Sequence, residues 1–251
     1  MEKIALISDI HSNIVALKAV LKDIEERGIT RIFCLGDIVL KGSSPCEVFD
    51  LVRGKCEIII KGNCDNYAVN KDHFHPNWHR ERLGKERISF LEHLPMYKDI
   101  FISGSHIRFF HATKNDLDYR IFDTSPESEK MKLFEDENGN VPDIVIYADI
   151  HKQYLEKIQN KTIVNIGSVG NPLEISLPQV LTDENMKELT QAHYCILEGT
   201  IDSKEKKPLG IQFVRVPYDI EEELALAKKN NTPGYEQYEL ELRMGKYRGK
   251  K

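Results

Sequence analysis

The sequence contains no apolar run long enough to cross a membrane. Its longest uninterrupted apolar run, Ile144 to Ala148, has five residues, whereas a membrane-spanning helix needs about 20. The apolar stretch after Lys3 ends at Asp9, which is too short for the core of a signal peptide and lacks a small-residue cleavage site. We therefore expect a cytoplasmic protein that has no membrane partner.

Paired cysteines and an excess of basic charge are also missing. The 251 residues include five cysteines, none of them in a C-x-x-C pair, which argues against a disulfide framework and against a thiolate zinc site. Lys and Arg total 35 against 40 Asp and Glu, so the net charge is −5. Without a basic stripe, sequence-specific nucleic-acid binding is not expected. The sequence leaves open whether the chain forms a homo-oligomer.

The first part of the sequence alternates between strand-like and helix-like segments. Apolar segments with the length of strands lie at 4–8, 31–35 and 57–61. Apolar residues at helical spacing predict helices at 14–27 and 45–52. Such alternation predicts parallel β-α-β pairing, in which functional residues lie at the carboxyl ends of the strands.

The remaining sequence is richer in strands. Strand-like segments lie at 99–102, 107–111, 144–148, 153–158, 162–166, 194–198 and 211–216. Weaker helical patterns lie at 127–135 and 221–229. We therefore predict an α/β (α+β) fold in which two sheets pack face to face, with helices outside them.

A polar, histidine-rich segment at about 66–86 is predicted to be an inserted loop before an amphipathic helix near 83–91, and a polar tail covers about 230–251. We take residues 1–251 as a single domain. His73, His75 and His79 in the insertion are candidates for binding substrate, either by stacking on a base or by supplying a proton from the rim. The alternative is that they belong to a solvated loop.

Side chains that commonly bind metal ions follow five of the strand-like segments. The candidate ligands are Asp9, His11, Asp37, Asn63, His111, Asp149 and His151. Taken singly, each is more often a turn residue, a helix cap or a structural histidine than a metal ligand. Together they predict a metal site, because carboxylate, amide and imidazole ligands suit Mn²⁺, Fe or Zn²⁺. A shared carboxylate could hold two ions roughly 3.5 to 4 Å apart.

The order of these residues resembles the calcineurin-like metallophosphoesterases, of the small bacterial and archaeal phosphodiesterase type. The resemblance rests on D-x-H at Asp9, G-D-x-x-x-x-G from Gly36, G-N at Gly62, and N-I-G-S-V-G-N-P at 165–172. It covers essentially the whole chain. It implies a four-layer αββα sandwich with two mixed β-sheets.

The resemblance also implies roles for individual residues. Asp9, His11 and His151 would hold one metal ion, Asn63 and His111 the other, and Asp37 would bridge them. A metal-bound hydroxide would then attack phosphorus in line with the leaving oxygen. Catalytic roles are implied for Asp37, Asn63 and Asp65.

Two positions depart from the family pattern. Asp149 replaces the first histidine of G-H-x-H; as a ligand of the second ion it favours Mn²⁺ or Fe over Zn²⁺. Cys64 replaces the histidine expected to protonate the leaving group, and a thiol with an ordinary pKa of about 8.5 is a poor substitute. Substrates with good leaving groups are therefore predicted. Within this family the sequence resembles the bacterial asymmetric diadenosine tetraphosphatases, which implies a nucleotide or phosphoester substrate as the partner.

Other functions remain open on the sequence alone. The chain could be a general phosphodiesterase or a protein phosphatase, although poor leaving groups would react slowly without a general acid. It could also be a catalytically weak scaffold on the same fold that binds other proteins.

Overall fold

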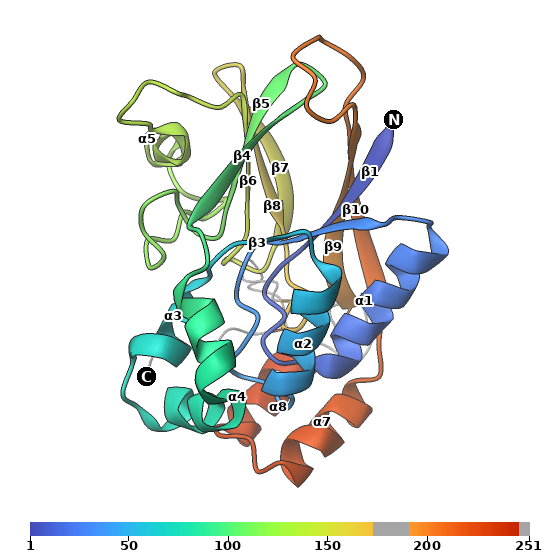
Figure 1. Ribbon diagram of the computed structural model, residues 1–251, viewed down its shortest axis with the longest axis vertical. Coiled ribbons are helices and arrows are strands. Elements are labelled where there is room, and N and C mark those ends of the chain that lie inside the picture. The colour runs from blue at the N-terminus through green and yellow to red at the C-terminus, as the bar shows by residue number, and fades with distance from the viewer. Residues whose placement is uncertain (173–190, 246–251) are drawn as a thin grey trace.

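Two five-stranded β-sheets form the centre of the computed structural model, which describes residues 1–172 and 191–245 (Figure 1). The first sheet has the order β10 (Gly210–Pro217), β9 (Gln191–Gly199), β1 (Glu2–Ile7), β2 (Arg31–Cys34) and β3 (Ile58–Ile59). Strands β1, β2 and β3 are parallel. Strands β9 and β10 pair antiparallel, so the sheet is mixed.

The second sheet is also mixed. Its order is β4 (Tyr97–Ile102), β5 (Ser105–Phe110), β6 (Ile144–Tyr147), β8 (Lys161–Ile166) and β7 (Gln153–Ile158). The three central strands β5, β6 and β8 are parallel, and the two edge strands pair antiparallel. Because the carboxyl ends of β1, β2, β5 and β6 carry most of the predicted ligands, this topology brings those residues to one end of the sandwich.

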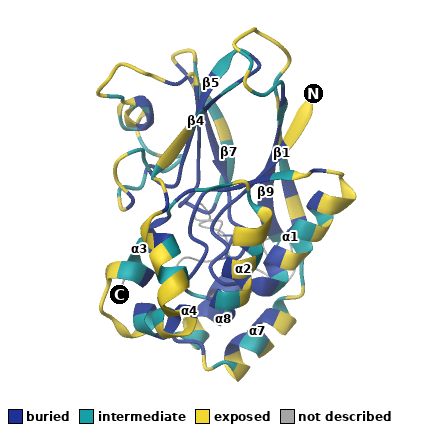
Figure 2. Cartoon of the chain, viewed as in Figure 1, coloured by how far each residue is buried: buried dark blue, intermediate teal, exposed yellow. Residues whose placement is uncertain are grey.

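The sheets pack against each other through a buried apolar layer (Figure 2). Leu6 and Phe33 of the first sheet belong to the same cluster as Phe109 and Ile146 of the second. The rings of Phe33 and Phe109 meet edge to face, with centroids 5.8 Å apart. This layer fixes the two sheets relative to each other, and with them the loops at the strand ends.

Helices cover the outer face of the first sheet, while the second sheet has a thinner cover. The helices on the first side are α1 (Ile14–Glu26), α2 (Pro45–Lys55), α7 (Ile220–Lys229) and α8 (Tyr235–Met244). On the second sheet, the described chain covers the apolar surface with α5 (Glu127–Lys130), a 3₁₀ turn (Met131–Phe134) and irregular segments. Among the described residues, no helix has the length and apolar character needed to span a membrane.

The predicted loop at 66–86 is wrong. This region forms most of α3 (Asn63–Asn70) and α4 (Phe74–Glu92), with a kink at Gly84. Trp78 and Leu83 are buried, and the Arg80 guanidinium donates to the carbonyl of Ala68, which ties the two helices together. The polar residues between these anchors hide the helical spacing in the sequence.

The polar tail is likewise partly helical. Tyr238 and Leu242 of α8 pack against α7, and residues 246–251 lie outside the described part of the chain.

Candidate metal centre

The backbone is left-handed at five of the seven candidate ligands. Asp9, His11, Asp37, Asp149 and His151 have φ between 49° and 64°. A non-glycine residue in this region costs of order 1 to 3 kcal/mol and persists only where its surroundings enforce it. Here the loops enforce it on one another, since the amides of Asp9 and His11 donate to the carbonyls of Gly36 and Asp37. Such concentrated strain is typical of a functional site.

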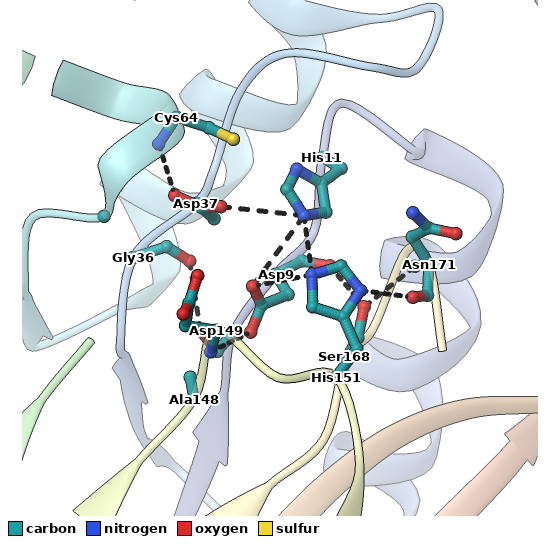
Figure 3. A network of polar contacts seen from close by, with 12 residues as sticks. Asp9, His11, Gly36, Asp37, Cys64, Ala148, Asp149, His151, Ser168 and Asn171 are labelled. Carbon is teal, nitrogen blue, oxygen red and sulfur yellow. Dashed lines mark hydrogen bonds and ion pairs between the residues drawn. The ribbon is translucent and has the colours of Figure 1, made fainter. Parts of the chain in front are cut away.

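The first group of side chains surrounds His11 (Figure 3). Its Nε2 lies 3.1 Å from Nε2 of His151 and 3.6 Å from Oδ2 of Asp37. His151 Nε2 is also 3.2 Å from Oδ1 of Asp9. All of these residues are buried, so Asp9, His11 and His151 form a compact set of ligand-type atoms.

The second group surrounds His111. Its Nε2 lies 3.1 Å from Oδ1 of Asn63, 3.4 Å from Oδ1 of Asp37 and 3.8 Å from Oδ1 of Asp149. Asp37 therefore contacts both histidine groups. The structure thus brings all seven candidate ligands into one buried cluster.

Backbone carbonyls orient the histidines. Nδ1 of His111 donates to the carbonyl of Leu35 at 2.7 Å, and Nδ1 of His151 donates to the carbonyl of Asn171 at 2.5 Å. Because a carbonyl can only accept, the proton of each neutral ring lies on Nδ1, and the Nε2 lone pair points into the cluster. This is the usual support for histidines that bind metal through Nε2.

One buried acceptor of the cluster lacks a donor within the described chain, and a cation would supply it with a partner. The amide of Asn63 lies beside Nε2 of His111 and both carboxylate oxygens of Asp37. Oδ1 of Asp9 is buried and has no hydrogen bond among the described residues. Buried acceptors without a donor are costly. The donor set of oxygen and imidazole nitrogen therefore fits divalent metal ions.

The electrostatics agree with this interpretation. Burial lowers the pKa of His111, but the Asp37 and Asp9 carboxylates outweigh it and raise that pKa well above its ordinary value. Burial would raise the pKa of Asp37, yet His111 and His11 bring it well below its usual range. Burial raises the pKa of Asp149, against the lowering by His111 and Arg120. In the absence of an ion, a proton on His111 compensates Asp37 and Asp9, and the Arg120 guanidinium together with His111 compensates Asp149.

Asp65 holds the loop that carries Asp37 and does not point at the ligand atoms. Its buried carboxylate accepts hydrogen bonds from the amides of Asp37, Ile38, Val39 and Gly62 at 2.9 to 3.3 Å. Gly62 is needed because a Cβ there would lie 2.1 Å from Oδ1 of Asp37. These contacts support a positioning role for Asp65 rather than contact with substrate.

Two basic side chains near the cluster, Arg120 and Lys41, were not among the predicted site residues. The Arg120 guanidinium forms a bidentate ion pair with Asp149, with Nε–Oδ2 at 2.8 Å and Nη2–Oδ1 at 3.0 Å. The pKa of His11 lies well below its ordinary value, mainly because the ring is buried and next because the Lys41 ammonium is near. Neither is marked by a motif, because Arg120 lies in irregular chain and Lys41 within a loop.

The three histidines suggested for substrate binding have other surroundings. His79 is buried beside the Trp78 ring, and burial lowers its pKa to about 3. His73 stacks on His75, whose ring lies against Gly234. Substrate binding by these three histidines stays a prediction.

The chain matches a known family over most of its length. A profile described as "Calcineurin-like phosphoesterase superfamily domain" matches residues 2–203. An uncharacterized protein of Methanocaldococcus jannaschii is 31% identical over 257 aligned positions, covering 92% of this chain and 93% of the relative.

Solved structures share the fold. A metallophosphoesterase from Sphaerobacter thermophilus superposes with a TM-score of 0.72 at 22% identity, covering 97% of this chain and 99% of that one. A hypothetical protein from Pyrococcus horikoshii superposes with a TM-score of 0.78 at 20% identity, covering 98% and 99%. Identities this low bear on the fold alone, and they confirm the predicted fold class.

Proposed function

Because this chain belongs to the calcineurin-like phosphoesterase superfamily and is a metal-dependent hydrolase, we propose that it cleaves phosphoanhydride or activated phosphodiester bonds with two metal ions. The observation that carries the proposal is the convergence of buried carboxylate, amide and imidazole groups, among them Oδ1 of Asp9, which has no hydrogen-bond partner in the described part of the chain. Two bound ions would activate water and neutralise phosphoryl oxygens.

The contacts support a division of the ligands between two ions. Asp9, His11 and His151 would hold one ion, and Asn63, His111 and Asp149 the other. Asp37 contacts both histidine groups, which suits a bridging carboxylate. The oxygen-rich second set favours Mn²⁺ or Fe, with Zn²⁺ as the alternative.

The chain's own residues would orient the reacting groups. The carbonyls of Leu35 and Asn171 hold the histidine rings, and Asp65 fixes the loop that carries Asp37. No imidazole follows Asn63 to protonate a leaving oxygen, because Cys64 occupies that position. Burial and the Asp37 carboxylate raise the pKa of Cys64 well above its ordinary value, which makes its thiol a weak acid.

The absent general acid favours substrates that need none. A nucleotide that leaves from a phosphoanhydride departs as a stabilised phosphate anion, whereas an alkoxide must be protonated. We therefore propose a dinucleoside polyphosphate such as diadenosine tetraphosphate, cleaved asymmetrically to ATP and AMP. Simple diesters and phosphoproteins, with poorer leaving groups, are expected to react more slowly.

The test compares three substrates with the Mn²⁺-loaded protein: diadenosine tetraphosphate, bis-p-nitrophenyl phosphate and a phosphoserine peptide. We expect ATP and AMP from the first at the highest rate, and loss of activity in Asp37→Asn. If the activated diester alone is hydrolysed, the nucleotide substrate is wrong while the metal-dependent reaction stands. If Asp37→Asn keeps the wild-type rate, the metal site is wrong.

A further inference from the structure

Cys64 belongs to the cluster by geometry as well as by position in the sequence. Its Sγ, a carboxylate oxygen of Asp37 and a ring nitrogen of His11 all lie within 4.8 Å of one another. In Figure 3 the sulfur atom points to the side on which the His11 ring lies. A set of three donor types this compact is the size of a metal-ion coordination shell.

The backbone holds the thiol in that place. Cys64 lies in the first turn of α3, and its amide donates to Oδ1 of Asp37 at 2.7 Å. The side chain is only 9% exposed. Cys64 therefore moves with Asp37, and its sulfur needs no large rearrangement to meet an ion bound by that carboxylate.

An independent feature shows that this side of the cluster needs a cation. Oδ1 of Asp9 is fully buried without a hydrogen-bond partner among the described residues, and it lies 3.7 Å from Nε2 of His11. The His11 ring thus lies beside an unpartnered carboxylate oxygen of Asp9, the Asp37 carboxylate and the Cys64 sulfur.

We propose that Cys64 is a metal ligand, which adds a thiolate to the ion held by His11 and Asp37. The inference rests on the proposed function, and it specifies the metal. When the metal–sulfur bond forms, the thiol proton passes to the solvent. A bound cation favours that loss, since a coordinating thiol is deprotonated outright.

The added thiolate changes which ion this site prefers. Thiolate ligands favour Zn²⁺ and other soft or borderline ions, whereas Mn²⁺ prefers carboxylates and carbonyls. We therefore expect Zn²⁺ or Fe²⁺ beside His11, and a harder ion such as Mn²⁺ in the oxygen-rich set around Asn63. The sulfur would also take a coordination position that water could otherwise fill.

The test is a titration of the full metal-free chain with Co²⁺, without added thiols. Imidazole and carboxylate ligands give only visible d–d bands, whereas a thiolate adds a sulfur-to-cobalt charge-transfer band in the near ultraviolet. We expect this band in the wild type, its loss in Cys64→Ser, and its retention in Cys56→Ser. Cys56 is a suitable control because it is also a free cysteine but lies at the end of α2.

Competition between ions gives a second measurement. Cys64→Ser should bind Zn²⁺ at least about tenfold more weakly than the wild type, because losing even an outer-shell partner of a metal ligand weakens binding by about that much. Its affinity for Mn²⁺ should change less. Visible bands without the charge-transfer band in the wild type would overturn the thiolate ligand and leave the metal site intact. No Co²⁺ binding at all would overturn the proposed function as well. The wild-type spectrum alone shows whether a thiolate binds the ion, even if Cys64→Ser fails to fold.

Discussion

The ion pair between Arg120 and Asp149 predicts a link between stability and metal binding. The Asp149 side chain is 1% exposed and the Arg120 side chain 29% exposed. Arg120→Ala leaves a buried carboxylate without its partner, which costs 3 to 5 kcal/mol for a fully buried pair. Because Arg120 is partly solvated, we expect the metal-free protein to lose about 2 kcal/mol of its free energy of unfolding.

A bound ion should reduce that loss, because the cation then compensates Asp149. We expect the same substitution to cost less than about 1 kcal/mol in saturating Mn²⁺. By thermodynamic linkage, this difference of more than about 1 kcal/mol means that Mn²⁺ binds Arg120→Ala at least about fivefold more tightly than the wild type. The variant would thus be less stable and bind metal better.

The assay is urea unfolding of wild type and Arg120→Ala, each without metal and with saturating Mn²⁺. The double variant with Asp149→Asn isolates the coupling from other contacts of Arg120. Arg27→Ala is the control, since it breaks only a surface pair with Asp23 on α1 and should cost about 0.3 to 0.5 kcal/mol in both conditions. Equal losses for Arg120→Ala with and without Mn²⁺ would refute the reasoning.

Three further predictions concern other residues. Burial raises the pKa of Glu223 to about 7 from 4.5, so between these two values the folded protein keeps a proton that the unfolded chain releases. About 3 kcal/mol of stability is therefore lost as the pH rises from about 4.5 to about 7, of which about 2 kcal/mol lies above pH 5.5. Urea unfolding at pH 5.5 and 8 should show a smaller loss in Glu223→Gln than in the wild type, and an unchanged loss would contradict this. Cys64→His should accelerate hydrolysis of a diester with a poor leaving group more than that of bis-p-nitrophenyl phosphate, and equal effects would argue against a missing general acid. Gly62→Ala, whose Cβ would lie 2.2 Å from the amide nitrogen of Asp37, should abolish Mn²⁺ binding in calorimetry; wild-type affinity would show that the loop tolerates displacement.

The candidate ligands could be predicted because their positions follow from local sequence. Asp9 and Asp149 lie two residues beyond the ends of β1 and β6, and Asp37 lies three residues beyond the end of β2. Parallel strands bring such positions to one edge. The two-sheet architecture followed from the same strand pattern.

Other features could not be predicted because they depend on contacts distant in sequence. Arg120 pairs with Asp149 across 29 positions from irregular chain. The carbonyl of Asn171 orients His151 through the main chain, which side-chain identity does not reveal. The helix predicted near 83–91 is the last part of α4, but the helical chain before it, from 63 to 82, was missed because it is anchored by scattered residues such as Trp78, with charged and histidine side chains between them.

The central claim is that the buried acceptor cluster binds two divalent ions. The most direct measurement is an anomalous difference map from crystals of the protein soaked in Mn²⁺. We predict two peaks roughly 3.5 to 4 Å apart, on either side of Asp37, with Asp9, His11 and His151 around one and Asn63 and His111 around the other. A map without a peak at Asp37, from crystals that bind Mn²⁺ only elsewhere, would contradict the account.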